Sequence, residues 1–386
     1  MAMKCQGIAA ASGAFVEIQA AGAVLQSVEE LIASPPPDVP YLAPGFIDIQ
    51  VNGYAGVDYC LPGATVEDIG RSLEAQFATG VTRLFPTVIT GPREGMLEAL
   101  RMLARARREL PYGQAMEAFH VEGPHISPED GPRGAHPREH VRPPDYAEFL
   151  AWQEAAEGHV RLVTVAAEWP EAPAYIEKLV SQGVVVALGH TSPAPAQLDA
   201  AVRAGATLST HLGNGSHAML RRHPNYIWDQ LADDRLNASF IGDGIHLDAS
   251  FLKVALRAKG LERSVLITDA VMPAGCPPGR YALGAVTVEL HPEGRVTVEG
   301  TQQLAGSVLR MDRGIENLMR LCGLSLRDAV SLATQNPARV GRIPGRLRGL
   351  QPGERADLVE FAFAAETKSI RILRTWLDGQ LVYTAP

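Results

Sequence analysis

Cysteine is scarce in this sequence, and its spacing excludes one class of protein. The four cysteines, Cys5, Cys60, Cys276 and Cys322, lie far apart and form no Cys-x-x-Cys pair. A disulfide framework is therefore not expected, and a reducing compartment fits better. We predict a cytoplasmic protein.

Long apolar runs and blocks of one charge are also absent. No run of about 18 apolar residues occurs, so we expect no membrane span and no membrane partner. The charged residues, 35 Lys and Arg against 43 Asp and Glu, give a net charge of −8. This balance lacks the basic footprint of a nucleic-acid-binding protein, so we expect no nucleic-acid partner. A few local cations could still bind an anionic substrate.

What the chain does have is an alternation of apolar strands with longer helical stretches. Helical patterns at 66–79, 94–109 and 145–157 separate several of the strands. The eight candidate strands are 45–52, 81–89, 116–122, 160–166, 184–190, 206–211, 238–243 and 264–269. This order predicts an α/β fold of the (β/α)₈ TIM-barrel type, with a doubly wound open sheet as the alternative.

Both ends of the chain are rich in strand patterns and lie outside the predicted barrel. The proline cluster at 34–40 indicates a linker after the N-terminal strand pattern. We predict a small β domain from residues 1–43 and 345–386, and a barrel domain over 44–344. Two alternating runs around "HPEG" predict a β-hairpin insertion near 279–300, before a helical pattern resumes at 312–340.

Ionisable residues stand at the ends of several predicted strands, where barrel enzymes carry their active sites. They are Glu122, His190, His211 and Asp269, and His246 follows the seventh strand. Two imidazoles and one carboxylate form a catalytic zinc set that leaves a position for water, and the remaining carboxylate, Asp269, fits a base. Each residue alone could be structural, but charged groups clustered there would be costly unless paired or metal-bound.

The first predicted strand ends in "GFIDIQVNG", where metal-dependent hydrolases often carry His-x-His. The two positions are Gln50 and Asn52, which are poor zinc ligands. The stretch therefore indicates either that the metal site was lost or that the metal is bound by other residues.

A series of motifs in order along the chain resembles one known family. The motifs are "APGFIDIQVNG", "GVTRLFPT", "HVEGPHISPEDGPRGAHP", "LGHTS", "STHLGNG", "GDGIHLD", "LITDAVMPAG" and "LAGSVLRMDRGIENL". Together they resemble the N-acetylglucosamine-6-phosphate deacetylases of the amidohydrolase superfamily. The resemblance covers roughly residues 43 to 360. It implies a barrel with a small β-sandwich built from both termini, and a homodimer.

The resemblance also implies residue roles. Glu122, His190 and His211 would bind one divalent metal ion per subunit, with zinc favoured and iron or cobalt as alternatives. Asp269 would be the general acid and base, and His136 would help to polarise the acetamido carbonyl. His246 would contact the sugar or its phosphate. Some family members carry Gln-x-Asn on the first strand and work with one metal, so Gln50 and Asn52 would mark a mononuclear site.

The expected reaction is hydrolysis of N-acetylglucosamine 6-phosphate to glucosamine 6-phosphate and acetate. Asn214 and Gly215 match phosphate-side positions of the family. Arg222, with Arg221 beside it, falls where an arginine would reach the phosphate of the neighbouring subunit's substrate. The surrounding "RRHPNYIW" departs from the usual sequence, and a solvated basic turn is the alternative.

Three other functions remain as alternatives. A different N-acetylated sugar, phosphorylated or not, is the first. A dihydroorotase-like amidohydrolase would need His-x-His on the first strand and a carbamylated lysine at the end of the fourth. It is disfavoured because the fourth strand, "VRLVTVAAEWP", has no lysine. A non-catalytic sugar-phosphate-binding protein would be favoured only if a ligand or Asp269 were missing.

Overall fold

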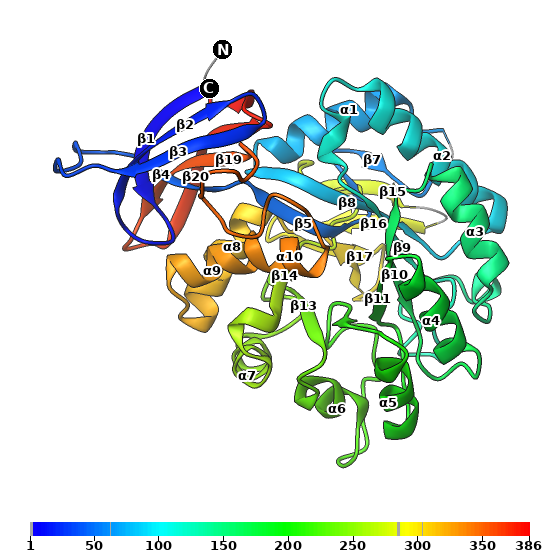
Figure 1. Ribbon diagram of the computed structural model, residues 1–386. Coiled ribbons are helices and arrows are strands. Elements are labelled where there is room, and N and C mark those ends of the chain that lie inside the picture. Colours follow the sequence, from blue (N-terminus) through cyan, green and yellow to red (C-terminus); the bar gives the residue numbers. More distant parts are fainter. Residues whose placement is uncertain (1–2, 62, 284–285, 303) are drawn as a thin grey trace.

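A parallel barrel forms the centre of the computed structural model, which describes residues 3–61, 63–283, 286–302 and 304–386 (Figure 1). Seven parallel pairings join its eight strands in chain order. The strands are β5 (Phe46–Val51), β8 (Val81–Ile89), β9 (Phe119–Glu122), β10 (Val160–Val165), β11 (Val185–Leu188), β12 (Leu208–Ser209), β13 (Asn237–Ile241) and β14 (Ser264–Ile267). The predicted (β/α)₈ barrel is therefore confirmed, and the open-sheet alternative is wrong.

The barrel closes between β5 and β14 through a few backbone bonds and one side chain. A parallel bridge joins Val51 to Ala270, and Asp269 N donates to Gln50 O at 2.9 Å. Further down, the Asp48 carboxylate accepts hydrogen bonds from the backbone N–H and the hydroxyl of Thr268. Asp48 thus supplies hydrogen-bond acceptors where β5 and β14 are not joined by a regular series of backbone hydrogen bonds. Burial raises the pKa of Asp48 to about 7.

One helix follows each barrel strand and lies on the outside of the barrel (Figure 1). They are α1 (Val66–Phe77), α2 (Arg93–Glu109), α3 (Tyr146–Ala155), α4 (Ala172–Ser181), α5 (Pro195–Arg203), α6 (Tyr226–Ala232), α7 (Ala249–Lys259) and α8 (Met311–Cys322). The start of α1 shows how local sequence sets a helix boundary. The side chains of Thr65 and Asp68 each accept a hydrogen bond from the other residue's backbone N–H and form a capping box. The predicted helical region 312–340 is three helices, because Gly323 in left-handed conformation ends α8 before α9 (Leu326–Leu332) and α10 (Gln335–Val340).

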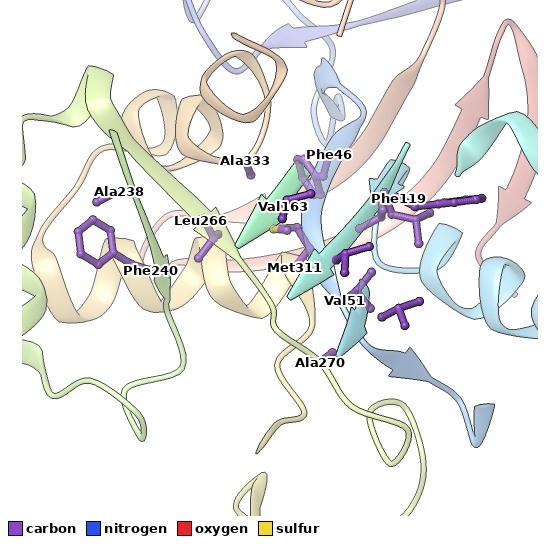
Figure 2. Close-up of a cluster of buried hydrophobic side chains, with 14 of the residues drawn as sticks. Phe46, Val51, Phe119, Val163, Ala238, Phe240, Leu266, Ala270, Met311 and Ala333 are labelled. Atoms are coloured by element: carbon purple, nitrogen blue, oxygen red, sulfur yellow. The ribbon is translucent and has the colours of Figure 1, made fainter. Parts of the chain in front are cut away.

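Two apolar layers explain why the barrel strands are buried on both faces. The inner layer fills the barrel with side chains from or next to every strand, such as Ile47, Phe85 and Leu162. The outer layer packs between the sheet and the helices and includes Phe119, Phe240 and others drawn in Figure 2. The barrel interior is therefore a packed core.

The two chain ends form a separate small β domain beside the barrel (Figure 1). Its seven-stranded sheet has the order β21-β20-β19-β4-β1-β2-β3. The strands are β1 (Met3–Ala9), β2 (Phe15–Ala21), β3 (Val24–Glu30), β4 (Tyr41–Pro44), β19 (Leu358–Ala364), β20 (Ser369–Leu377) and β21 (Gln380–Thr384). Leu25 N donates to Glu354 O at 2.9 Å, so β3 also reaches the segment leading into β19. This confirms the predicted domain built from both termini.

Short elements complete the described chain. Where a hairpin was predicted near 279–300, the structure has a four-stranded antiparallel sheet, and "HPEG" forms its central turn. Its strands are β15 (Gly279–Leu283), β16 (Val286–Leu290), β17 (Arg295–Val298) and β18 (Leu304–Ser307). The other short elements are β6 (Gly53–Tyr54), β7 (Val57–Asp58), η1 (Gly113–Ala115), η2 (Arg138–His140) and η3 (Leu261–Arg263). None of the helices in the described ranges is both long enough and apolar enough to cross a bilayer.

A buried ion-pair network joins the β domain to the barrel. Arg83, near the start of β8, donates to Asp357 at 2.7 Å and to Asp378 at 2.6 Å. Arg346 donates to the same Asp357 oxygen at 2.6 Å. Because the two guanidinium groups and Asp357 are almost fully buried, each charge depends on its partners.

We expect Asp357→Ala to destabilise the protein by about 3–5 kcal/mol, because it leaves two buried guanidinium groups without their shared carboxylate. Urea unfolding followed by circular dichroism measures this loss. Glu109→Ala is the control: it breaks an exposed pair with Arg105 and should cost less than about 1 kcal/mol. Equal midpoints for the two variants would show that the network does not hold the domains together.

Candidate active site

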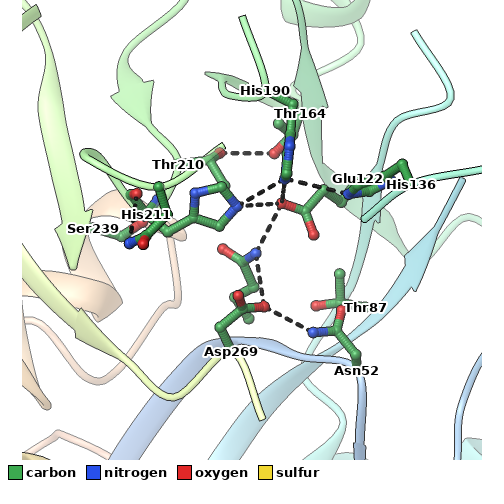
Figure 3. A network of polar contacts seen from close by, with 12 residues as sticks. Asn52, Thr87, Glu122, His136, Thr164, His190, Thr210, His211, Ser239 and Asp269 are labelled. Carbon is green, nitrogen blue, oxygen red and sulfur yellow. Dashed lines mark hydrogen bonds and ion pairs between the residues drawn. The ribbon is translucent and has the colours of Figure 1, made fainter. Parts of the chain in front are cut away.

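Polar side chains converge at the carboxyl ends of the barrel strands (Figure 3). Glu122 is the last residue of β9, and His190, His211 and Asp269 each stand two residues beyond β11, β12 and β14. The structure thus brings together all four residues that the strand ends predicted. Glu122, His190 and His211 are buried, and Asp269 is partly exposed.

The backbone turns sharply at three of these positions. His190, His211 and Asp269 have positive φ angles of 49°, 29° and 49°. Residues other than glycine rarely adopt this left-handed conformation, which costs roughly 1–3 kcal/mol when it is strained. Such outliers persist where surrounding contacts enforce them and are common at functional sites. Here the turn directs each side chain into the mouth of the barrel.

Glu122, His190 and His211 form a tight cluster. Glu122 Oε1 lies 2.8 Å from His211 Nε2 and 3.3 Å from His190 Nε2, and the two imidazole nitrogens are 3.0 Å apart. A tetrahedral metal with bonds of about 2.0–2.1 Å separates its ligand atoms by roughly 3.3–3.4 Å. The donor atoms are therefore spaced nearly as ligands of one cation.

A fourth donor, His136, reaches the same cluster from the loop after β9. Its Nε2 lies 3.2 Å from His190 Nε2, and Glu122, His136 and His190 all present donor atoms within 4.8 Å of one another. Two triads therefore share Glu122 and His190, with His136 or His211 as the third member. His211 is the closer to Glu122, so the geometry favours the predicted ligand set and leaves His136 beside it.

Hydrogen bonds fix the ring of His190. Its Nδ1 lies 2.8 Å from the carbonyl oxygen of Pro132, so Nδ1 carries the proton and the Nε2 lone pair faces the cluster. Glycines pack against this ring: a Cβ on Gly215 would lie 2.7 Å from His190 Nδ1, and one on Gly134 3.1 Å from Cε1. Gly215, predicted on the phosphate side, therefore also makes room for His190.

The electrostatics of the cluster favour a cation. Burial alone would raise the pKa of Glu122, but hydrogen bonds and charges from His190 and His211 lower it well below its usual value. Burial also opposes charge on His211, yet Glu122 raises its pKa to about 8. His211 Nδ1 is buried and has no hydrogen-bond partner in the described part of the chain. An ionised carboxylate facing converging imidazoles is a donor set that suits a divalent metal.

His136 is held differently. Burial, reinforced by the charge of His190, lowers the pKa of His136 to about 3, so its ring is neutral. The Thr90 hydroxyl lies 2.7 Å from His136 Nδ1. The sequence analysis missed Thr90, although it stands directly after β8, where other strands carry site residues. Thr90 orients the ring and leaves Nε2 facing the cluster.

Asp269 accepts two amide hydrogen bonds on one oxygen. Asn52 Nδ2 donates to Asp269 Oδ1 at 2.7 Å, and Gln50 Nε2 donates to it at 3.1 Å. Gln50 Nε2 also lies 3.0 Å from Glu122 Oε1. Desolvation of the Asp269 carboxyl group, together with the charge of Glu122, raises its pKa to about 6. A carboxyl group with this pKa can take up and release a proton near neutral pH.

The remaining predicted residues contact groups outside the Glu122–His190–His211 cluster or lie beside it. His246 follows β13, and its Nδ1 pairs with Asp243 at 2.6 Å. Asn214 Nδ2 donates to His211 O at 3.3 Å, beside the cluster. Arg221 and Arg222 are exposed in the loop before α6, and Asn225 donates to both of their carbonyl oxygens. Among the residues that the structure describes, no ion pair is made by either guanidinium.

Three further histidines near the barrel have structural partners. His120 is buried, and its Nε2 lies 2.8 Å from the Thr164 hydroxyl. His125 packs edge-on and tilted against two aromatic rings in the core. His217 pairs with the Tyr226 hydroxyl at 3.0 Å. None of these contacts joins the cluster around Glu122.

Comparison with known proteins agrees with this fold and site. Residues 41–382 match the amidohydrolase family. The chain therefore belongs to the amidohydrolase family, and it is a hydrolase that acts on an amide. The family is metal-dependent, in keeping with the Glu and His cluster.

Relatives of known name indicate which branch of the amidohydrolase family the chain belongs to. The chain is 35% identical over 89% of its length to bovine N-acetylglucosamine-6-phosphate deacetylase, covering 83% of that protein. It is 32% identical over 95% of its length to N-acetylgalactosamine-6-phosphate deacetylase of Escherichia coli O157:H7, covering 94% of it. A mutant N-acetyl-D-glucosamine-6-phosphate deacetylase from Mycobacterium smegmatis, solved with N-acetyl-D-glucosamine-6-phosphate, matches with a TM-score of 0.87 at 30% identity, covering 100% and 99% of the two chains. The predicted membership of the N-acetylglucosamine-6-phosphate deacetylase family is confirmed.

We expect Gly215→Ala to lower metal retention after dialysis, because the added Cβ would collide with the ring of His190. Elemental analysis of the dialysed protein measures this loss, and Glu122→Ala gives the reference for a missing ligand. Gly158→Ala is the matched control, since Gly158 has a similar positive φ of 80° but no atom within 4 Å of the added Cβ. Full metal content in Gly215→Ala would show that the contact between Gly215 and the His190 ring does not matter for metal binding.

Proposed function

We propose that the protein is a metal-dependent deacetylase that hydrolyses N-acetylglucosamine 6-phosphate to glucosamine 6-phosphate and acetate. The observation that carries this proposal is the Glu122–His190–His211 cluster with Asp269 and His136 on either side. The relatives that match most of the chain are named as deacetylases of N-acetylglucosamine 6-phosphate or N-acetylgalactosamine 6-phosphate.

The metal would be held by Glu122, His190 and His211, one ion per subunit, with zinc favoured over iron or cobalt because two imidazoles and one carboxylate are a common catalytic zinc set. When bound, it would lower the pKa of a water molecule and stabilise negative charge on the acetyl oxygen. Gln50 and Asn52 donate N–H groups to Asp269 and Glu122, and this arrangement supports a mononuclear site.

The protein's own residues move the protons. Asp269 takes a proton from water as the water oxygen bonds to the acetyl carbon. The carbonyl oxygen becomes negative, and the neutral His136 donates to it from Nε2 while Nδ1 accepts from Thr90. Asp269 then returns the proton to the amide nitrogen, and the C–N bond breaks. The products are acetate and the free amine.

Substrate recognition would use the outer part of the barrel mouth. His246, oriented by Asp243, would contact the sugar or its phosphate. Asn214 and Gly215 would face the phosphate from the backbone after His211. N-acetylgalactosamine 6-phosphate, the C4 epimer, is the second candidate substrate, because a relative named for it is 32% identical over most of both chains.

We also propose a cytoplasmic homodimer. The loop before α6 exposes Met219 (91%) and Leu220 (38%), and Trp228 on α6 is 48% exposed. Exposed apolar side chains grouped in this way are typical of an interface. Arg222 in the same loop would then reach the phosphate in the partner's site, with Arg221 as the alternative. The four free cysteines are consistent with a reducing compartment.

Acetate release from the metal-reconstituted protein tests the reaction. N-acetylglucosamine 6-phosphate should be at least about tenfold better in kcat/KM than unphosphorylated N-acetylglucosamine, because charged hydrogen bonds to the phosphate are lost without it. The galactosamine epimer is assayed in parallel. Equal rates with and without phosphate would overturn the phosphate requirement and bring forward other N-acetylated sugars.

Asp269→Asn should retain the metal but lose turnover by about 10²–10⁴-fold, because an amide cannot accept the proton. In the wild-type protein, kcat should fall as the pH drops through about 6, where Asp269 becomes protonated. A pH–rate profile and metal analysis measure both effects. Near-wild-type turnover in Asp269→Asn would remove this assignment of the base.

Complementation tests the dimer. Asp269→Asn and Arg222→Ala are each expected to be nearly inactive, but their mixture should recover up to about a quarter of wild-type activity, since half of the dimers would contain one intact site. Arg221→Ala takes the place of Arg222→Ala in a parallel mixture to decide between the two arginines. No recovery after subunit exchange in either mixture would exclude a shared site.

A further inference from the structure

The polar pair at the end of β5 has contacts that a passive replacement for metal ligands does not need. Gln50 is 1% and Asn52 8% exposed, and both amides donate to the same oxygen, Asp269 Oδ1. No hydrogen bond to the other oxygen, Oδ2, is found within the described residues. The two oxygens of this carboxylate therefore have different surroundings.

We infer that Gln50 and Asn52 form an amide clamp that fixes Asp269 Oδ1, so that Oδ2 alone exchanges protons with water and substrate. The inference rests on the proposed deacetylase function and adds two positioning residues to it. The clamp does not touch the reacting atoms. It acts through Asp269, by holding the carboxylate in one rotation.

The orientation of the Asn52 amide follows from its neighbours. A carboxylate oxygen is an acceptor, so Asn52 must turn its N–H side toward Asp269 Oδ1, at 2.7 Å. The opposite atom, Asn52 Oδ1, is buried and has no hydrogen-bond partner in the described ranges. Asn52 thus gives up one acceptor contact to keep its donor on Asp269. That choice indicates that its main partner is the carboxylate.

Gln50 links the two carboxylates of the site. Its Nε2 lies 3.0 Å from Glu122 Oε1 and 3.1 Å from Asp269 Oδ1. Two carboxylates near one another repel, and a positive group between them relieves the repulsion. The partial positive charge of the Gln50 amide takes this place without adding net charge. Gln50 therefore allows Glu122 and Asp269 to share one site with a single cation.

The backbone supports the same orientation. Asp269 has φ of 49°, and its N–H donates to Gln50 O at 2.9 Å. Gln50 thus holds both the main chain and the side chain of Asp269. Among the described residues, the titratable groups that interact with this carboxylate include Glu122, His211, His246 and Asp48.

Asn52→Leu tests the clamp, because leucine has nearly the same volume but no donor. We expect kcat to fall by about 10- to 100-fold, with KM changed less than about threefold and metal content unchanged. The acid limb of the pH–rate profile should move to higher pH, because a lost donor to the charged form raises the pKa of Asp269. Gln50→Met should act in the same direction, and Asn52→Ala should be no worse than Asn52→Leu.

The matched control is Asn237→Leu, the same substitution at the opposite end of the barrel. Asn237 Nδ2 donates to Thr207 O at 3.0 Å, so this variant also loses one amide hydrogen bond, which is partly buried. It should keep the wild-type kcat and pH profile. If Asn52→Leu keeps kcat within about threefold while Asn52→Ala does not, the role is packing and the clamp is excluded.

A second readout does not depend on activity. The loss of melting temperature in Asn52→Leu should be larger at about pH 8, where Asp269 is ionised and needs its donors, than at about pH 5. Asn237→Leu should lose the same amount at both pH values. An equal loss for Asn52→Leu at both pH values would overturn the inference. If the wild-type protein deacetylates no sugar phosphate, the proposed function fails, and this comparison alone decides the clamp.

Discussion

The site depends on a negative charge buried at the end of β9. Glu122 is only 2% exposed, and an isolated carboxylate there would cost several kcal/mol. His190, His211 and Gln50 surround the same oxygen, Glu122 Oε1, and keep the group ionised. The left-handed turns at His190 and His211 follow from this requirement, because they bring imidazoles from β11 and β12 to one carboxylate. In the proposed function, a metal ion would complete the balance of charge.

The molecule separates stability from chemistry along the barrel axis. Arg83, at the start of β8, ties the β domain to the barrel through Asp357, while Thr90 directly follows the same strand and orients His136. In (β/α)₈ enzymes, residues at the amino-terminal ends of the strands generally stabilise the fold, and loops at the carboxyl ends carry the active site. Here the apolar layer inside the barrel lies between the two polar networks. Changes to one network therefore need not disturb the other.

Much of the architecture could be predicted from local pattern. Most of the eight strands are rich in apolar residues, and β8 spans Val81–Ile89, the predicted range. Glu122, His190, His211 and Asp269 could be found because each ends an apolar strand. The four-stranded sheet at 279–307 could not be resolved beyond one hairpin, because all of its strands are short and β15 is only partly buried.

Contacts between distant segments could not be predicted from the pattern. Gln50 and Asp269 are 219 residues apart, and Thr90 and His136 are 46 apart, so no spacing in the sequence joins them. Gly215 is similar: the sequence indicates a glycine near the substrate but not its contact with the His190 ring. For Gln50, Asp269 and Gly215 the sequence identified the residue, and only the fold shows the atom it touches. Thr90 emerged only from its contact with His136.

The amide clamp also bears on how the reaction would depend on metal supply. Where a second cation orients the base, that orientation is lost whenever the second site is empty. Gln50 lies in β5 and Asn52 directly follows this strand, so their amides belong to the chain itself and hold Asp269 at every metal concentration. Their cost is weaker electrostatic stabilisation, since an amide carries only partial charge. The pKa of Asp269, raised to about 6 by burial and by Glu122, is consistent with that weaker field and keeps the group usable as both base and acid near neutral pH.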